Sequence, residues 1–212
     1  MRRLPVYLLI DTSGSMSGEP IEAVRNGIQT LVSALRQDPY ALETAHLSVI
    51  TFSSSARQDV PLTELPQFQP VQITASGATA MGEALTLVAA CAGREVAKST
   101  PEAKGDWKPL VFLLTDGEPT DNFERGLAEF RKQRWGLVIA CAAGVSANTA
   151  LLQQVTECVV QLDTTDSAAF KAFFKWVSAS VSTSSKSVES GGKEITGLDQ
   201  LPPPPKEISI VT

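Results

Sequence analysis

Strand-length apolar runs alternate with segments of helical periodicity along most of the chain, and this alternation limits the fold more than any other feature. The runs are continuously apolar, which is typical of strands buried on both faces of a parallel sheet. Between them, apolar residues recur every three or four positions, as from Ile21 to Leu35, and predict helices with one apolar face. The expected strands are 5–11, 47–54, 60–65, 110–114, 137–144 and 158–162.

Six strands alternating with helices predict an α/β fold, with a doubly wound, mostly parallel sheet and helices on both faces. The 60–65 segment contains Pro61, which fits an edge strand and not a central one. With 212 residues, the chain is long enough for one such domain and an appendage.

The composition changes after about Lys186, first to Ser, Gly and Lys and then to LPPPPK at 201–206. We therefore expect a folded domain over residues 1–185 and a Ser/Gly/Pro-rich linker and C-terminal tail over 186–212. The four prolines favour an extended polyproline segment. The final ISIVT could add a strand to a partner's sheet, but a mobile tail is the simpler expectation.

Charge and composition exclude several classes of function. The net charge is −5 and no Lys/Arg cluster forms a basic stripe, so nucleic-acid binding is not supported. One histidine and three widely spaced cysteines favour neither a zinc site nor a disulfide. The start imitates a signal peptide, but Asp11 interrupts its apolar run and no small-residue cleavage site follows. No apolar stretch approaches the ~18 residues of a membrane helix, so we expect a soluble cytoplasmic protein.

Two of the apolar runs end on an acid. The first ends at Asp11, which is followed by Ser13 and Ser15, and the run LVFLLTDG ends at Asp116. In an open α/β sheet, ligands bind outside the carboxyl ends of the strands, at the switch point, where the first and fourth strands of this order commonly lie side by side. The two acidic loops should therefore face each other, and Thr79, in the loop before the second long helix, can reach the same crevice.

These five residues offer two carboxylates and three hydroxyls, with no sulfur or imidazole. Hard oxygen donors of this kind suit Mg²⁺ or Mn²⁺ with some waters retained. Residues i and i+2 of an extended loop project to the same side, so Asp11, Ser13 and Ser15 can present their oxygens in one direction. Two carboxylates that meet without a cation repel each other, and a metal resolves the conflict. Locally, the serines could instead cap a helix, and Asp116-Gly117 could be a simple turn.

The DTSGS run at 11–15, with Thr79 and then TDG at 115–117, resembles the metal-ion-dependent adhesion site of the von Willebrand factor A domain family. The resemblance covers about residues 4–183. It implies a Rossmann-like sheet with one antiparallel edge strand, and an open coordination position that an acidic side chain of a partner protein completes. The metal ligands that it implies are Ser13, Ser15 and Thr79 directly, and Asp11 and Asp116 directly or through water.

More narrowly, the short chain with TDGEPTD at 115–121 resembles the TerY-type proteins of bacterial tellurite-resistance clusters. That resemblance implies a role in a tellurite or stress-resistance system. It also implies two partners, a metal-dependent serine/threonine phosphatase of the PP2C type and a kinase-like protein.

The family resemblance implies a binding module and not an enzyme. The alternative is a metal-dependent phosphoryl-transfer enzyme with Asp11 as nucleophile. Enzymes of the haloacid dehalogenase type place a second acid two residues after the first, where this chain has Ser13. A nucleotide-binding fold or a serine hydrolase is not supported, because the chain has no GxGxxG, GxxxxGK[ST] or GxSxG motif.

Overall fold

One mixed β-sheet organises the described part of the chain, which in this computed structural model is residues 2–69, 71–145, 147–190 and 194–211. Its strands are β1 (Leu4–Asp11), β2 (Ala45–Phe52), β3 (Ala56–Glu64), β4 (Leu110–Thr115), β5 (Leu137–Ala143), β6 (Val159–Leu162) and β7 (Ile208–Ile210). Their order across the sheet is β3-β2-β1-β4-β5-β6-β7. The five inner strands run parallel, and the two edge strands pair antiparallel with their neighbours.

The doubly wound, mostly parallel α/β architecture is confirmed, but the prediction of six strands is wrong. The seventh strand, β7, comes from the last residues of the chain and pairs with β6 from Leu162 to Val160. Without β7, β6 would present its unpaired N–H and C=O groups at the edge of the sheet. The other edge strand, β3, is longer than the expected 60–65 because it begins at Ala56, directly after the turn from β2.

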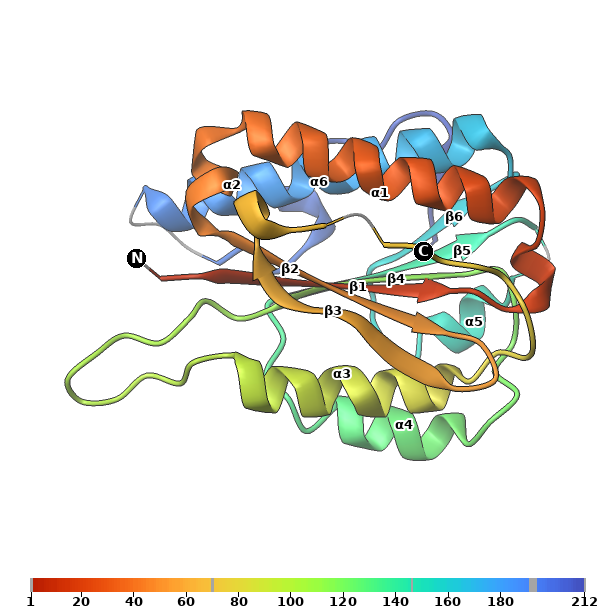
Figure 1. The fold of residues 1–212 in the computed structure, drawn as a ribbon, viewed down its shortest axis with the longest axis horizontal. Helices are drawn as coiled ribbons and strands as arrows, with labels where there is room; N and C mark the ends of the chain where they lie inside the picture. Colours follow the sequence, from red (N-terminus) through yellow and green to blue (C-terminus); the bar gives the residue numbers. More distant parts are fainter. Residues whose placement is uncertain (1, 70, 146, 191–193, 212) are drawn as a thin grey trace.

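Helices cover both faces of the sheet. They are α1 (Glu19–Gln37), α2 (Pro39–Thr44), α3 (Met81–Glu95), α4 (Phe123–Phe130), α5 (Thr149–Leu152) and α6 (Ser167–Glu189), with 3₁₀ turns η1 (Gly14–Met16), η2 (Leu65–Gln67) and η3 (Leu198–Gln200). Figure 1 shows α1, α2 and α6 on one face of the sheet and α3 and α4 on the other.

The central strand β1 divides the core between these two layers. Successive side chains of a strand point to opposite faces, so Leu8 and Ile10 pack with the apolar residues of α1 and α6. Tyr7 and Leu9 pack on the other side, with the apolar residues of α3 and α4. All eight residues of β1 are buried, as the continuous apolar run predicts.

Two consecutive residues before α4, Asp121 and Asn122, could each cap that helix. Asn122 is the cap, and its side chain accepts a hydrogen bond from the Arg125 amide. The carboxylate of Asp121 accepts hydrogen bonds from the amides of Gly82 (2.9 Å) and Glu83 (2.7 Å), at the start of α3. A residue 38 positions away in sequence therefore caps α3, which local spacing cannot predict.

Residues 194–211 pack against the domain, so the expectation of a mobile tail is wrong for them. Ile195, Leu201 and Ile208 are buried in the core that contains α6. The indole N–H of Trp176 donates to the Pro202 carbonyl at 2.8 Å. Helix α6 itself continues to Glu189, past the boundary placed at residue 185. The division into a domain and a separate tail stays a prediction.

Candidate metal centre

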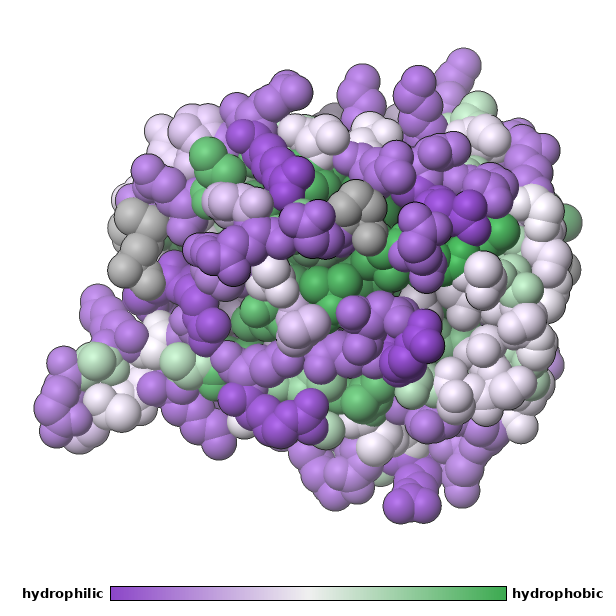
Figure 2. Space-filling model, in the orientation of Figure 1, coloured by the Kyte–Doolittle hydropathy of each residue, from purple (hydrophilic) through white to green (hydrophobic). Residues whose placement is uncertain are grey.

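The carboxyl ends of β1 and β4 place two acids at the same edge of the sheet. The two strands pair in parallel up to Ile10 and Leu114, so Asp11 and the loop containing Asp116 follow side by side, as the sequence predicts. This edge lies at the right of Figure 1, where the arrow of β1 ends. Figure 2 shows the same end in pale colours, which mark residues of intermediate hydropathy.

Asp11 is fully buried and both of its carboxylate oxygens accept hydrogen bonds. Oδ1 accepts from the Ser13 amide at 2.8 Å, and Oδ2 accepts from the Thr115 hydroxyl at 2.5 Å. Burial raises the pKa of Asp11, and the charge of Asp116 adds to this effect, whereas the hydrogen bonds from Ser13 and Thr115 oppose it. The folded chain thus places a carboxylate where a negative charge is costly without a nearby cation.

Two serine hydroxyls connect the acidic loops. The Ser13 and Ser15 hydroxyl oxygens lie 3.0 Å apart, and the Ser15 hydroxyl donates to Oδ1 of Asp116 at 2.7 Å. Ser13 is buried, Asp116 is half-buried and Ser15 is exposed. Oxygen atoms therefore extend from the buried Asp11 to the surface of the molecule.

Thr79 lies beside this cluster, on the third loop. Its backbone is fixed on both sides by Thr120, whose hydroxyl accepts from the Thr79 amide (3.0 Å) and whose amide donates to the Thr79 carbonyl (2.9 Å). The Thr79 hydroxyl is 3.6 Å from the point where a Cβ on Gly117 would lie. Thr79 thus adjoins the loop of Asp116.

Backbone hydrogen bonds attach the Thr79 loop to the loop after β1. The Gly14 amide donates to the Gly77 carbonyl at 3.0 Å, and the Ser76 amide donates to the Thr12 carbonyl at 2.9 Å. Gly77 has φ +77°, a left-handed conformation that suits glycine. The structure therefore brings four of the five predicted residues into one hydrogen-bonded cluster, and places the fifth, Thr79, at its side.

The chemistry of this cluster fits a hard divalent cation. In the described part of the chain, neither Asp11 nor Asp116 has an ion pair or hydrogen bond with a Lys, Arg or His side chain. The described part of the chain contains no group of three His, Cys, Asp or Glu side chains that could hold a metal. Carboxylate and hydroxyl oxygens are the ligands that Mg²⁺ and Mn²⁺ prefer.

Two residues of the site were assigned no role from the sequence. Thr115 donates its hydroxyl to Asp11, and Thr120 holds the backbone of Thr79. Both belong to the TDGEPTD segment, so the motif could have indicated them. Their hydrogen-bond partners, Asp11 and Thr79, could not be predicted. Each partner lies on a different loop and becomes a neighbour only in the folded sheet.

The sequence profile of the von Willebrand factor type A domain matches residues 6–174 of the chain. The chain belongs to the von Willebrand factor type A (VWA) domain family. VWA domains are typically non-catalytic modules that bind other proteins. An uncharacterised protein of Synechocystis is 34% identical over 124 residues, which is 55% of this chain and 26% of that protein.

Several solved structures share the VWA fold. The pilus adhesin SpaC of Lactobacillus rhamnosus GG, in its open conformation, matches with a TM-score of 0.68 and 15% identity, over 86% of this chain and 30% of SpaC. A von Willebrand factor type A protein of Catenulispora acidiphila matches with a TM-score of 0.63 and 17% identity, over 86% and 43%. Proximal thread matrix protein 1 of the mussel byssus, with a zinc-occupied MIDAS motif, matches with a TM-score of 0.57 and 20% identity, over 84% and 46%.

The VWA chain spans about a quarter of its Synechocystis relative and less than half of each of these structures. These comparisons give no support to the narrower resemblance to tellurite-resistance proteins. Among the residues that the structure describes, every helix is too short or too polar to cross a bilayer.

Proposed function

We propose that this VWA domain is a metal-dependent protein-interaction module. The residues proposed to hold Mg²⁺ or Mn²⁺ are Asp11, Ser13, Ser15, Thr79 and Asp116. One observation carries the proposal. Carboxylates from two neighbouring strand ends are joined through the Ser13 amide and the Ser13 and Ser15 hydroxyls, and no basic side chain among the described residues binds either acid. A divalent cation would balance these charges. The zinc-occupied MIDAS of the mussel byssus protein supports the assignment, since it is a metal site on the same fold.

The five residues would contribute in different ways. Asp11 is buried and its oxygens already orient the Ser13 amide and the Thr115 hydroxyl, so it supplies negative charge and holds the loop. Ser15 and Asp116 reach the surface and are the more accessible donors. When bound, the cation would offer a coordination position to a carboxylate of another protein. The proposed partner is therefore a protein that presents an exposed Asp or Glu side chain.

A PP2C-type phosphatase and a kinase-like protein remain partners proposed from sequence resemblance alone. Either one would have to present an acidic side chain at its contact surface. Partner capture from a lysate tests both proteins without assuming a role in tellurite resistance.

The geometry argues against the phosphoryl-transfer alternative. A nucleophilic Asp11 would need an oxygen open to the substrate, but its side chain is fully buried and both oxygens are hydrogen-bonded. Ser13 occupies the position of the second acid. Measurable turnover of generic phosphoesters that disappears in Asp11→Asn would restore this alternative.

Direct metal binding is the first test. Isothermal titration calorimetry with MgCl₂ and MnCl₂ should give binding to the wild type, and loss of binding in Asp116→Ala and in Ser13→Ala. Ser17→Ala is the matched control, because Ser17 is exposed on the same loop and contributes no ligand. Equal affinity in all four proteins would contradict the proposed ligand set.

Partner capture is the second test. The immobilised domain is incubated with a lysate of the source organism in Mg²⁺/Mn²⁺ or in EDTA, with Asp11→Ala as a control. A protein retained only by the wild type and only with metal supports the proposal and identifies the partner. The same retention in all three conditions would assign binding to another surface.

A further inference from the structure

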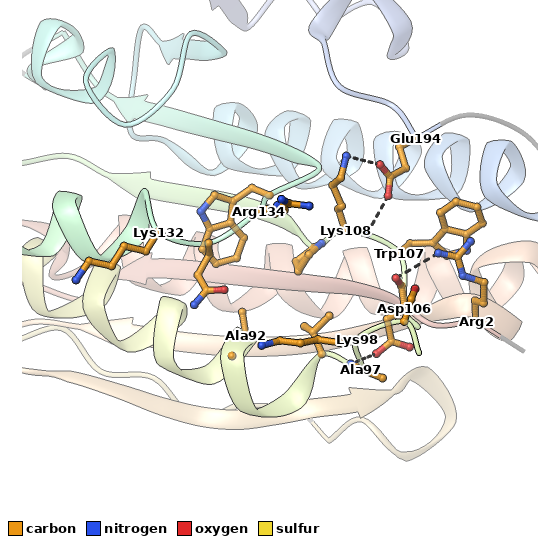
Figure 3. Close-up of a pocket in the computed structure, with 16 residues that line it drawn as sticks. Arg2, Ala92, Ala97, Lys98, Asp106, Trp107, Lys108, Lys132, Arg134 and Glu194 are labelled. Atoms are coloured by element: carbon orange, nitrogen blue, oxygen red, sulfur yellow. Dashed lines mark hydrogen bonds and ion pairs between the residues drawn. The ribbon is translucent and has the colours of Figure 1, made fainter. Parts of the chain in front are cut away.

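A concave region lies at the opposite end of the sheet from the candidate metal centre. It is a cavity of about 570 Å³. Its walls come from the segments just before β1, β4 and β5, the end of α3, and the loop that follows α3 (Figure 3). The eight residues of β1 separate the two ends, a distance of roughly 25 Å at the usual rise per residue. One small ligand cannot reach both regions.

The cavity is cationic, although the whole protein has a net charge of −5. Five basic and two acidic residues line it, namely Arg2, Lys98, Lys108, Lys132 and Arg134 against Asp106 and Glu194. Both acids are already neutralised. Asp106 pairs with Arg3 at 2.6 Å, and Glu194 pairs with Lys108 at 2.7 Å and also accepts from the Lys108 amide. Arg3 does not line the cavity. Because Arg3 already pairs with Asp106, that carboxylate does not compensate the basic residues that line the cavity.

Three of the basic residues have no acidic partner in the described part of the chain. Arg2 donates to the carbonyls of Gly105 (2.6 Å) and Asp106 (3.3 Å), and its guanidinium lies 3.5 Å from the centre of the Trp107 ring. These contacts fix its position but do not neutralise its charge. Lys98 and Arg134 form no hydrogen bond or ion pair with any described residue. Figure 3 shows them on different walls, with Lys132 farther out.

The size and walls of the cavity favour a small molecule over a macromolecule. Its volume lies within the roughly 300–1,000 Å³ of ligand sites in proteins. Trp107 and Trp135 are half-buried and line it, and indole rings favour contact with flat aromatic groups. Three uncompensated positive charges match several phosphate charges better than one carboxylate, and the fork of an arginine suits phosphate oxygens.

We propose that this cavity binds a small phosphate-bearing molecule with an aromatic ring, of the nucleotide class. Lys98 and Arg134 would contact the phosphates. Trp135 stacks on Phe130, with ring centroids 4.6 Å apart, and Arg2 lies over one face of Trp107, so each indole would offer only its other face to the ligand ring. The site differs from a Rossmann-type nucleotide site, which lies at the carboxyl ends of the strands. It is also independent of the proposed metal centre.

The test is isothermal titration calorimetry at low salt in EDTA, with ADP, AMP, adenosine and inorganic phosphate as probes. We expect ADP to bind more tightly than AMP, and higher salt to weaken both, because the attraction is electrostatic. Lys98→Ala and Arg134→Ala should each weaken ADP binding about tenfold or more. Lys171→Ala, which removes an exposed lysine from α6, should bind ADP like the wild type.

Asp11→Ala separates this proposal from the proposed function, since it should lose metal binding and keep ADP binding. No ADP binding at millimolar concentration would overturn the proposal, and so would ADP binding that both cavity variants retain. If inorganic phosphate binds as tightly as ADP, the proposed contact with an aromatic ring is wrong. An acidic peptide that binds this cavity while ADP does not would reassign it to a protein partner.

Discussion

Gly27 sits where helix α1 touches helix α6, and replacing it by alanine should destabilise the protein. An alanine Cβ at this position would lie 2.0 Å from Cδ2 of Phe174 and 2.6 Å from Cε2. Ordinary contacts begin near 3.4 Å, so the ring would have to move by about 1.4 Å. Phe174 is 1% exposed and stands edge-to-face against Phe173, with ring centroids 5.4 Å apart. The ring therefore has little room to withdraw.

Two opposing effects set the size of the change. Replacing glycine by alanine inside a helix normally stabilises a protein by about 0.5–1 kcal/mol, because the unfolded chain loses freedom. Forcing extra volume into a packed core costs about 1–3 kcal/mol. Because Phe174 is confined on several sides, we expect the second effect to win, with a net loss of about 1–2 kcal/mol. For a chain of this length, that is a fall in Tm of about 2–8 °C.

Urea unfolding followed by circular dichroism measures this change, and Gly93→Ala provides the matched control. Gly93 also lies inside a helix, α3, but the nearest atom to its added Cβ would be Nε2 of Gln133 at 3.6 Å, an ordinary contact. Gly93→Ala should therefore stabilise the protein by about 0.5–1 kcal/mol. The two substitutions are chemically identical, so their opposite signs would come from packing alone.

A double mutant tests the cause. If the clash with Phe174 is responsible, Gly27→Ala combined with Phe174→Leu should be less destabilised than the sum of the single changes, by about 1 kcal/mol. Stabilisation by Gly27→Ala alone, or strict additivity in the double mutant, would refute the reasoning about this helix contact.

Three further predictions follow from other parts of the molecule. Saturating Mg²⁺ at about 100 times its Kd should raise the free energy of unfolding by about 2.7 kcal/mol in the wild type and leave Asp116→Ala unchanged, as measured by urea unfolding with and without metal. Burial alone would raise the pKa of Asp106, but hydrogen bonds from Arg3 and Ala97 outweigh it and lower that pKa below the ordinary 3.8. The stabilisation by ionised Asp106 should then be complete well above the unfolded pKa of 3.8 and be lost as the pH falls through the lowered folded-state pKa. The urea midpoint should therefore fall less between pH 6 and pH 2 in Asp106→Asn than in the wild type. Ile208→Ala should cost about 2–5 kcal/mol because the side chain is 5% exposed, whereas Ile210→Ala, at 46% exposed, should change the urea midpoint little.

Sequence reasoning predicted the sheet well because its strands are buried on both faces. A continuous apolar run such as LLI before Asp11 has one stable location, the middle of a parallel sheet covered by helices. It correctly placed the 60–65 segment at an edge of the sheet, although β3 begins four residues earlier, at Ala56. It missed the other edge strand, β7, which is three residues long and has two exposed residues. Only the first residue of β7, Ile208, is buried in the core. The apolar pattern of this segment therefore does not distinguish a strand from an exposed tail. The pairing with β6 decides its structure, and pairing is a property of the folded chain.

The candidate metal site was predictable in position but not in detail. Strand ends of a parallel sheet meet at one edge, so two apolar runs that end in acids indicate a shared crevice. The hydrogen bonds that fix the crevice depend on side-chain positions that no spacing gives. Thr120 and Asp121 illustrate this, since they are consecutive and yet Thr120 holds Thr79 while Asp121 caps α3.

The cationic cavity shows why net charge can conceal a local excess of positive charge. Arg2, Lys98 and Arg134 are far apart in the sequence and form no basic stripe, so their grouping cannot be read from the charge pattern. The topology that gathers the acids at the carboxyl ends of β1 and β4 also brings the segments before β1, β4 and β5 together at the opposite edge. Which charges remain uncompensated there depends on ion pairs such as Arg3–Asp106. Because Arg3 neutralises Asp106 from outside the cavity, the charge of Arg2 remains available to an anionic ligand.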